Sequence, residues 1–246
     1  MTERVLGRLV RGVIHGSEYS QRVSLRSLLA WLLGASPAQI PPPSPAWATF
    51  PLPDGEPLLV WSAGRFEPPL SDLIRRAKYG RSWHSALTLS RVCAKTSGSW
   101  IWSHHPILIP IPSDPRRLPT RGFHLPLLIA QALSTQRECP LRRRGLTKPR
   151  SSEVQAGRSR GDRLRALSGL FEASASLSGK CVLLVDDVFT TGATLSAARQ
   201  ALNAVGAQVL GAVVAARVAT PRETRTGPAK IDRCRPRPKP QSKLSW

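Results

Sequence analysis

The stretch Gly179–Leu202, GKCVLLVDDVFTTGATLSAARQAL, decides the fold. It begins with an apolar run, continues with two adjacent aspartates, and then reaches three threonines around a glycine before a helical pattern starts. A run that is apolar at every position is typical of a strand buried on both faces of a parallel sheet. We therefore expect a strand at 181–185, a helix at 194–205 and another strand at 207–216, the alternation of an α/β protein.

Two carboxylates, Asp186 and Asp187, directly follow the apolar run. Ligands of open α/β sheets bind at the carboxyl ends of the strands, which is where these residues would lie. Adjacent carboxylates repel each other unless something compensates them. The hydroxyls of a sugar diol would do so, and so would a hydrated Mg²⁺. The pair is therefore our candidate for holding a diol or a magnesium ion.

The loop after the aspartates favours an anion site. Thr190, Thr191 and Thr194 offer hydroxyls, and Gly192, next to Ala193, lets the backbone approach a ligand closely. The free N–H groups and the positive dipole end of the following helix attract a phosphate. One loop thus offers acids and, a few residues later, a phosphate cradle. A ribose 5-phosphate has these two features at about that separation.

Other ligand loops do not match the chain. It contains no GxxxxGK[ST] and no GxGxxG after a strand, which argues against a Walker-type loop and a dinucleotide site. LLVDD also opens receiver domains, but these need a further aspartate on a later strand. The only acids after Asp187 are Glu223 and Asp232, which fall in the expected tail. We reject that interpretation.

The composition is strongly basic. The 246 residues include 36 Lys and Arg against 15 Asp and Glu, a formal net charge of +21. Such an excess attracts polyanions: nucleic acid, phosphorylated small molecules or anionic lipid. Basic loops and tails with no specific partner give the same excess, so charge alone does not name the partner.

The sequence predicts a cytoplasmic protein without membrane insertion. No apolar run approaches the roughly 18 residues that a spanning helix needs. The longest local candidate, SLLAWLLGA at 27–35, is too short and lies too far from Met1 for a signal peptide. The four cysteines are far apart and none forms a CxxC, which argues against a zinc ribbon and against a disulfide scaffold.

We divide the chain into three parts. Residues 1–57 form an N-terminal helical and Pro-rich segment, 58–219 the folded domain, and 220–246 a basic disordered tail. Eight prolines in 37–57 indicate a linker or an irregular wrap. The other expected elements are a helix around Val23–Leu33, strands at 58–61 and 107–111, helices at 70–79, 81–97 and 121–133, and a long mobile Arg-rich loop at 140–168.

These residues resemble a known family. VLLVDDVFTTGAT closely resembles the phosphoribosyl pyrophosphate (PRPP) signature of type I phosphoribosyltransferases. The segments LSDLIRRAKYGR, PIPSDPRRLPTRGFHLPLLIAQAL and GDRLRALSGLFEAS resemble, in that order, the conserved blocks of ComF/GntX-family proteins. The resemblance covers roughly residues 58–218. It implies the type I phosphoribosyltransferase fold, with a central, mainly parallel sheet flanked by helices.

The resemblance also implies roles for the opening stretch. Asp186 and Asp187 would bind the ribose hydroxyls with the help of Mg²⁺, and Asp187 is the candidate catalytic residue. The loop from Thr190 to Thr194 would hold the 5-phosphate. The activity implied is transfer of phosphoribosyl from PRPP to an unidentified acceptor with release of pyrophosphate.

Further residues are implied for the pyrophosphate. The turn PSDPRR, after the strand at 107–111, would be the pyrophosphate loop, with Arg116 or Arg117 facing the diphosphate. Lys78 lies in the KY block of the family and could reach a phosphate. The Arg-rich segment 141–165 corresponds to the flexible loop that closes over PRPP.

The chain departs from the family pattern in three places. Family members usually begin with a cysteine zinc module, but the first 92 residues contain no cysteine. His124 and Ala166 replace asparagines of the family's RGFN and RLRN motifs, and we expect His124 to be a surface or packing residue. An alternative function is therefore a non-catalytic PRPP sensor or a single-stranded-DNA-binding protein in competence and DNA uptake. The expected partners are PRPP, single-stranded DNA or the competence machinery, and a second copy of the chain.

Overall fold

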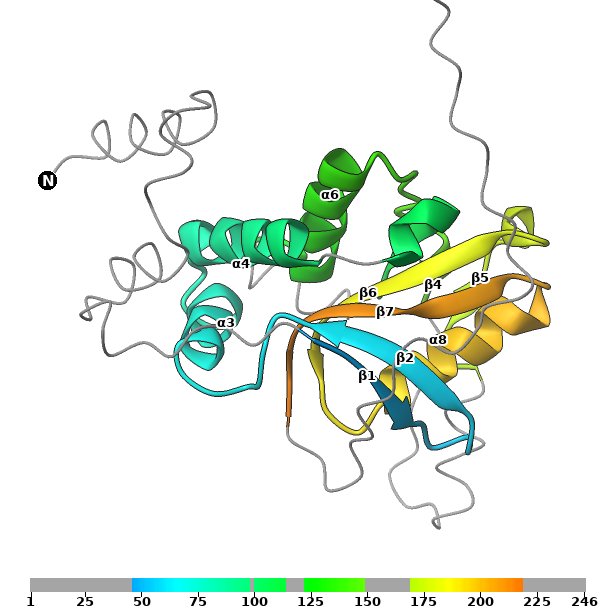
Figure 1. Cartoon of the computed structure of the whole chain (residues 1–246), viewed down its shortest axis with the longest axis horizontal. Coiled ribbons are helices and arrows are strands. Elements are labelled where there is room, and N and C mark those ends of the chain that lie inside the picture. The colour runs from blue at the N-terminus through cyan, green and yellow to red at the C-terminus, as the bar shows by residue number, and fades with distance from the viewer. Residues whose placement is uncertain (1–45, 98–99, 114–121, 149–168, 219–246) are drawn as a thin grey trace, which may run out of the picture. The chain divides into compact units, whose positions relative to one another are not determined.

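The computed structural model describes residues 46–97, 100–113, 122–148 and 169–218 (Figure 1). Its elements, in chain order, are β1 (Ala46–Pro51), β2 (Pro57–Ser62), α3 (Leu70–Lys78), α4 (Trp83–Thr96), the 3₁₀ helix η2 (Trp100–His104), β3 (Ile107–Pro110), α6 (Leu125–Arg137), β4 (Leu146–Thr147), β5 (Glu172–Ala173), the 3₁₀ helix η4 (Ala175–Leu177), β6 (Cys181–Phe189), α8 (Ala193–Ala204) and β7 (Gln208–Arg217).

Some expectations lie outside the described residues. They are the N-terminal helix around Val23–Leu33, the phosphate-contacting Arg116 and Arg117, the greater part of the Arg-rich loop, and the basic tail. Within the described ranges, no helix has the length and apolar character needed to cross a membrane.

A five-stranded sheet forms the centre, in the order β1-β2-β7-β6-β3 (Figure 1). The pairs β2–β7, β7–β6 and β6–β3 are parallel, and only the edge strand β1 runs antiparallel to its neighbour. Val182–Val185 are fully buried between β3 and β7, as a run apolar on both faces requires. The expected α/β class with a mainly parallel central sheet is therefore confirmed.

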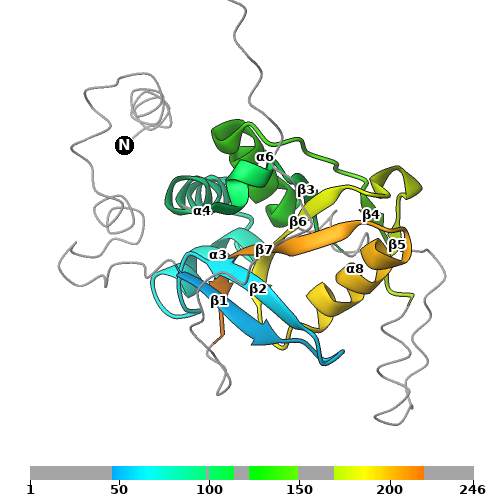
Figure 2. The same cartoon turned by 45° about the vertical axis from the view of Figure 1, so that its right-hand side comes forward.

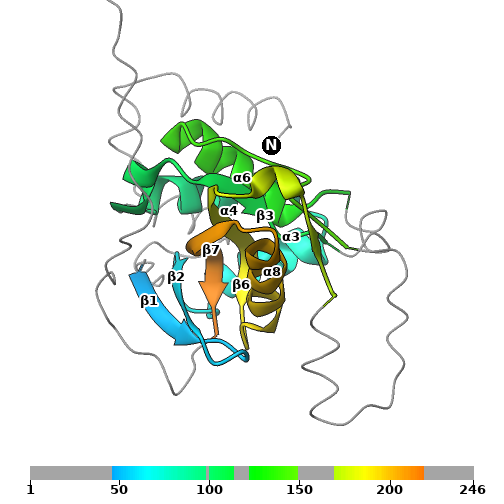
Figure 3. The same ribbon diagram turned by 90° about the vertical axis from the view of Figure 1, so that its right-hand side faces the viewer.

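Helices cover both faces of this sheet. The helices α3, α4 and α6 lie on one face, and α8 lies on the other (Figures 2 and 3). Helix α6 buries Leu125, Ile129 and Leu133, which are spaced so that they share one side of the helix. Leu195 and Leu202 of α8 join the core cluster on the opposite face.

The boundary expected after residue 57 falls inside β2, one residue after this strand begins, and so divides a β-hairpin. Residues 46–57, interpreted as part of a Pro-rich linker, form β1 and the turn that leads into β2. Ala48, Phe50 and Leu52 are buried at alternate positions of this segment. Its prolines lie where a sheet tolerates them: Pro51 is the last residue of the edge strand β1, Pro53 is in the turn, and Pro57 is the first residue of β2.

Arg199 of α8 fastens the hairpin turn to the rest of the domain. Its guanidinium group donates to Asp54 Oδ1 at 2.6 Å, to the Pro57 carbonyl at 3.0 Å and to the Glu56 carbonyl at 3.1 Å. Only 10% of the Arg199 side chain and 15% of the Asp54 side chain are exposed. The turn therefore depends on a nearly buried cation.

We expect Arg199→Met to lower the free energy of unfolding by about 2 kcal/mol, because a half-buried carboxylate and two carbonyls lose their donor. The midpoint of urea unfolding measures the effect. Arg75→Met is the matched control, because Arg75 pairs with Asp72 only at the surface and should change stability by less than about 0.5 kcal/mol. Equal losses in the two variants would contradict the role given to Arg199.

Candidate functional site

The acid pair lies within β6, where this strand extends beyond its neighbour. β3 pairs with β6 only as far as Pro110 and Val185, whereas β7 follows β6 to Phe189. The strand was expected to end at residue 185, but it continues through both aspartates. Beyond Val185, one edge of β6 has no strand partner among the described residues, and Asp186 and Asp187 lie on that part of the strand.

Lys78, the last residue of α3, contacts the acid pair. Its Nζ lies 2.7 Å from Asp187 Oδ1, and the exposed fractions of the two side chains are 19% and 14%. The structure therefore places this predicted site residue at the carboxylates. The two residues are 109 positions apart in the chain, so the fold alone brings them together.

The surroundings of Asp186 favour its protonated form. Burial, followed by the charge of Asp187, raises its pKa from 3.8 to about 8, although Lys78 and Lys148 act in the opposite direction. One of its oxygens, Oδ1, accepts the N–H of Asp187 at 2.8 Å. At neutral pH the pair therefore carries mainly the charge of Asp187, which the ammonium group of Lys78 balances. An incoming cation or a set of hydroxyl donors would stabilise the second negative charge.

The threonine loop connects β6 to the start of α8. Thr190, Thr191 and Thr194 are exposed, and Gly192 occupies the N-cap position with φ +77°. The cap has no side-chain hydrogen bond, and the first turn of α8 contains no acid. Thr191 Oγ1 makes only a long contact, 3.4 Å, with the Ala193 N–H. The loop therefore presents hydroxyls and helix N-terminal amides to solvent, the arrangement that binds phosphate.

We expect Gly192→Ala to lower stability by about 2 kcal/mol and to weaken any ligand of this loop. A Cβ at Gly192 would meet Leu52 Cδ2 at 2.6 Å and Phe189 at 3.1 Å, in addition to the strain of a positive φ. Urea unfolding measures the loss. Gly179→Ala is the matched control, since Gly179 has a φ of +67° but nothing within 4 Å of its Cβ position. If both variants lose the same stability, the packing against Leu52 is unimportant.

His124, expected to be a surface or packing residue, is half-buried and lies close enough to the acid pair for the charge of Asp187 to act on its ring. It precedes α6, and its Nε2 lies 2.8 Å from the Ile111 carbonyl, to which it donates. Burial lowers its pKa, while the bond to Ile111 and the charge of Asp187 raise it. The ring therefore links the start of α6 to the end of β3, beside the acids.

Two further features were not expected. Lys148, just after β4, lies 5.6 Å from the Phe171 ring centroid, and its charge reaches Asp186. Trp83, 47% exposed, packs edge-on against Phe123 with the ring centroids 5.5 Å apart. Trp83 follows Lys78 by five residues and Phe123 precedes His124, so the two segments that reach the acids also carry this aromatic pair.

The donor set fits one mode of magnesium binding. Mg²⁺ is usually held by one or two carboxylates together with waters and substrate phosphates. The described residues contain no group of three or more His, Cys, Asp or Glu that could form a protein cage. Asp186 and Asp187 would therefore hold an ion that shares its other ligands with a phosphorylated substrate.

Comparisons with known proteins agree with this geometry. A family model described as "Phosphoribosyl transferase domain" matches residues 126–236, which include α6, β6, the threonine loop, α8 and β7. Among solved structures, the orotate phosphoribosyltransferase of Mycobacterium tuberculosis H37Rv, crystallised with Fe(III) dicitrate, aligns over 79% of this chain and 85% of its own. Its sequence identity is 17% and its TM-score is 0.34.

Curated relatives carry related names. "DNA utilization protein YhgH" of Shigella flexneri is 32% identical over 149 residues, or 58% of this chain and 64% of that protein's own length. "Competence protein F" of Haemophilus influenzae is 29% identical over 152 residues, 59% of this chain and 66% of that protein. "Competence protein ComFC" of Bacillus subtilis is 33% identical over 98 residues, 40% of this chain and 38% of its own. The chain therefore resembles phosphoribosyl transferase domains over residues 126–236 and, over as much as about three fifths of its length, proteins named for DNA utilization and competence; it spans 64% of the length of the first of these relatives.

Proposed function

We propose that the chain binds PRPP with Mg²⁺ and transfers the phosphoribosyl group to a nitrogen acceptor, releasing pyrophosphate. One observation carries the proposal. A half-buried acid pair lies on the protruding end of the central strand, and a threonine loop that starts a helix follows it within the same turn. Acids for a diol and a cradle for a phosphate are thus adjacent, as a ribose 5-phosphate needs.

Each part of the site has a role in this proposal. Asp186 and Asp187 accept hydrogen bonds from the ribose hydroxyls, and the loop from Thr190 to Thr194 holds the 5-phosphate. Lys78 balances the charge of Asp187 and, once a ligand occupies the acids, its ammonium group is free to contact the diphosphate. Arg116 and Arg117, outside the described residues, are the remaining candidates for that contact.

The reaction needs no nucleophile from the protein. The bond from C1 of the ribose to the diphosphate oxygen breaks, the acceptor nitrogen bonds to C1, and the acceptor loses a proton. Mg²⁺ would supply positive charge for the departing diphosphate. The cationic residues add to that stabilisation, because they are fixed before the charge develops. Trp83, 47% exposed and packed against the half-buried Phe123, begins the helix that follows Lys78 and supports a planar acceptor such as a nucleobase.

Thermal unfolding with and without PRPP and Mg²⁺ tests binding, and pyrophosphate release with a panel of bases tests transfer. At about 100 times Kd, a ligand adds roughly 2.7 kcal/mol, which is on the order of 5 °C for a domain of this size. If PRPP and Mg²⁺ raise the unfolding temperature but no pyrophosphate is released, the protein binds PRPP without transferring its phosphoribosyl group. The absence of a shift in the folded protein would contradict the proposal.

A second candidate function is nucleic-acid binding, either without catalysis or together with PRPP sensing. The net charge of +21 favours it. The names of the similar proteins, DNA utilization protein and competence protein, point in the same direction. A salt-dependent affinity for single-stranded DNA is the expected sign, because each phosphate contact releases counterions.

A further inference from the structure

A basic pocket lies apart from the acid pair. It has a volume of about 280 Å³ and is formed by the segment between α6 and β4 and by the segment between β5 and β6. Arg142, Arg143 and Arg144 line one side, and Ser174 and Ser176 line the other. No carboxylate lines it. Three positive charges thus face two hydroxyl groups.

The arginine segment has a fixed backbone. The Arg142 N–H donates to the Leu108 carbonyl at 3.0 Å, which attaches the segment to the edge of β3. Gly145 donates to the Arg142 carbonyl at 3.2 Å and accepts the Ser174 N–H at 3.0 Å, joining the two sides of the pocket. Gly145 also packs so closely against Ile109 that a Cβ would not fit. The arginines therefore project from an ordered turn, which corrects the expectation of a mobile loop for residues 141–148.

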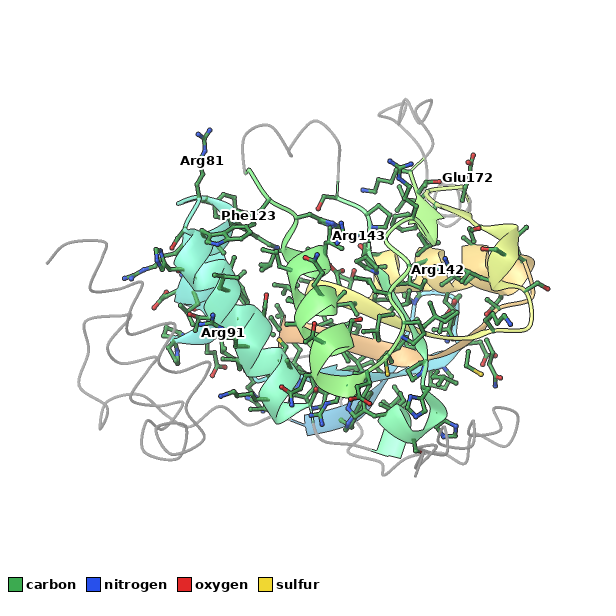
Figure 4. All side chains as sticks on the ribbon, turned by 90° about the horizontal axis from the view of Figure 1, so that it is seen from above. Arg81, Arg91, Phe123, Arg142, Arg143 and Glu172 are labelled. Carbon is green, nitrogen blue, oxygen red and sulfur yellow. The ribbon has the colours of Figure 1, made fainter. Side chains whose placement is uncertain are left out.

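These arginines form no ion pair with the described residues. Their side chains are exposed, and Figure 4 shows Arg142 and Arg143 on the segment beside α6. Glu172, the acid of the neighbouring hairpin, lies opposite Thr147 and points outward from β5 (Figure 4). By contrast, the guanidinium groups of Arg199 and Arg137 donate hydrogen bonds to carbonyls within the fold. The pocket charges are thus available for an external anion.

The pocket and the acid pair lie at different positions along the strands of the sheet. Arg142 is attached at Leu108, which is paired with Leu183, and Asp186 lies three residues further along β6. At about 3.3 Å per residue, that offset is roughly 10 Å. Ser174 and Ser176 come before the start of β6, at the end remote from the acids. The pocket is therefore distinct from the candidate PRPP site.

We propose that Arg142, Arg143 and Arg144 bind consecutive phosphates of a single-stranded nucleic acid. Guanidinium groups bind phosphate oxygens in a bidentate manner. The Ser174 and Ser176 hydroxyls are hydrogen-bonded to each other at 2.9 Å, so one of them keeps a proton to donate to a phosphate. Small-molecule sites bury most of their ligand, whereas exposed arginines around an open pocket suit a chain that lies across it. The proposal is independent of phosphoribosyl transfer, and it rests on the nucleic-acid candidate function.

Fluorescence anisotropy with a labelled oligodeoxythymidine, measured over a series of KCl concentrations on the full chain, tests the proposal. The variant Arg142→Gln/Arg143→Gln/Arg144→Gln should bind at least about tenfold more weakly. Its slope of log affinity against log salt should fall by about two, since each single-strand phosphate contributes about 0.7. The control Arg65→Gln/Arg91→Gln/Lys95→Gln removes the same charge outside the pocket and should change the slope by less than one.

The outcomes separate the possible sources of phosphate. Wild-type binding that both triple variants weaken equally would overturn the proposal in favour of diffuse attraction. Calorimetry with pyrophosphate is the second experiment. Suppose that pyrophosphate binds the wild type but not the pocket variant, and that both bind the oligonucleotide equally well. The pocket would then bind a free phosphate compound, and the proposal would fail. No binding of the oligonucleotide by the wild type would refute the nucleic-acid candidate and this inference together.

The PRPP site is tested separately in the same samples. The pocket variant should keep the thermal shift caused by PRPP and Mg²⁺, and Asp187→Asn should keep its affinity for the oligonucleotide. Loss of the PRPP shift in the pocket variant would assign these arginines to PRPP and overturn the proposal. Loss of the shift in Asp187→Asn alone supports both assignments.

Discussion

Asp187→Asn is expected to abolish the stabilisation of the protein by PRPP and Mg²⁺ and to slow pyrophosphate release by at least about 100-fold. In the proposed complex, the Asp187 carboxylate accepts charge-assisted hydrogen bonds from the ribose. Each such bond contributes about 1.5–3 kcal/mol, and each 1.36 kcal/mol is a factor of ten in rate or affinity. Differential scanning fluorimetry and a coupled pyrophosphate assay measure the two losses.

The substitution keeps the shape of the site. An amide oxygen can still accept from Lys78 Nζ, which lies 2.7 Å from Asp187 Oδ1, so the ligand-free variant should fold normally. Asp72→Asn serves as a control for the loss of one acid, because Asp72 is exposed on α3 and pairs only with Arg75. A ligand-induced shift of the same size in Asp187→Asn and in the wild type would remove Asp187 from the PRPP site.

The acid pair and its loop could be predicted because their neighbours in sequence are also their neighbours in space. The stretch from Val182 to Thr194 contains the buried strand, the acids, the glycine with positive φ and the helix start. Local chemistry therefore fixes most of the loop. The extent of β6 was missed because an Asp–Asp sequence is a poor strand former, and pairing with β7 overrides that preference.

The hairpin of β1 and β2 was missed because proline composition outweighed a periodic signal. The buried Ala48, Phe50 and Leu52 alternate with positions that are half-buried or exposed, and Asp54-Gly55 supplies a turn in which Gly55 has φ +86°. These are hairpin signals, and the flanking prolines lie at the ends of the edge strand. Weighing where the prolines lie, and not only how many there are, would have identified the strand.

Lys148 and His124 could not be assigned from sequence for a different reason. Lys148 follows a basic run in which no residue stands out, and its proximity to Asp186 results from the pairing of β4 with β5. His124 reaches Ile111 across 13 residues because α6 starts at Leu125 and leaves the ring free of the helix. Long-range geometry of this kind has no signature in a single sequence.

Asp186→Asn is expected to stabilise the ligand-free protein at alkaline pH. The folded chain holds the pKa of Asp186 at about 8, against 3.8 for an ordinary aspartate, because burial and the charge of Asp187 disfavour ionisation. Between about pH 4 and pH 8 the folded state keeps a proton that the unfolded state has released. Stability from this group is therefore complete below pH 4, decreases as the pH rises, and is lost above about pH 8.

Asparagine cannot ionise, so the variant avoids that loss while its amide oxygen can still accept the Asp187 N–H. The gain should be near zero below pH 4, rise by up to about 1.4 kcal/mol per pH unit, and reach several kcal/mol at pH 9, which is on the order of 10 °C in Tm. Thermal unfolding in EDTA without PRPP measures it. Parallel pH profiles of variant and wild type would show that Asp186 is not the titrating group. A rising gain would mean that the fold keeps this carboxylate at a cost in stability, which is expected of a ligand-binding residue and not of a structural one.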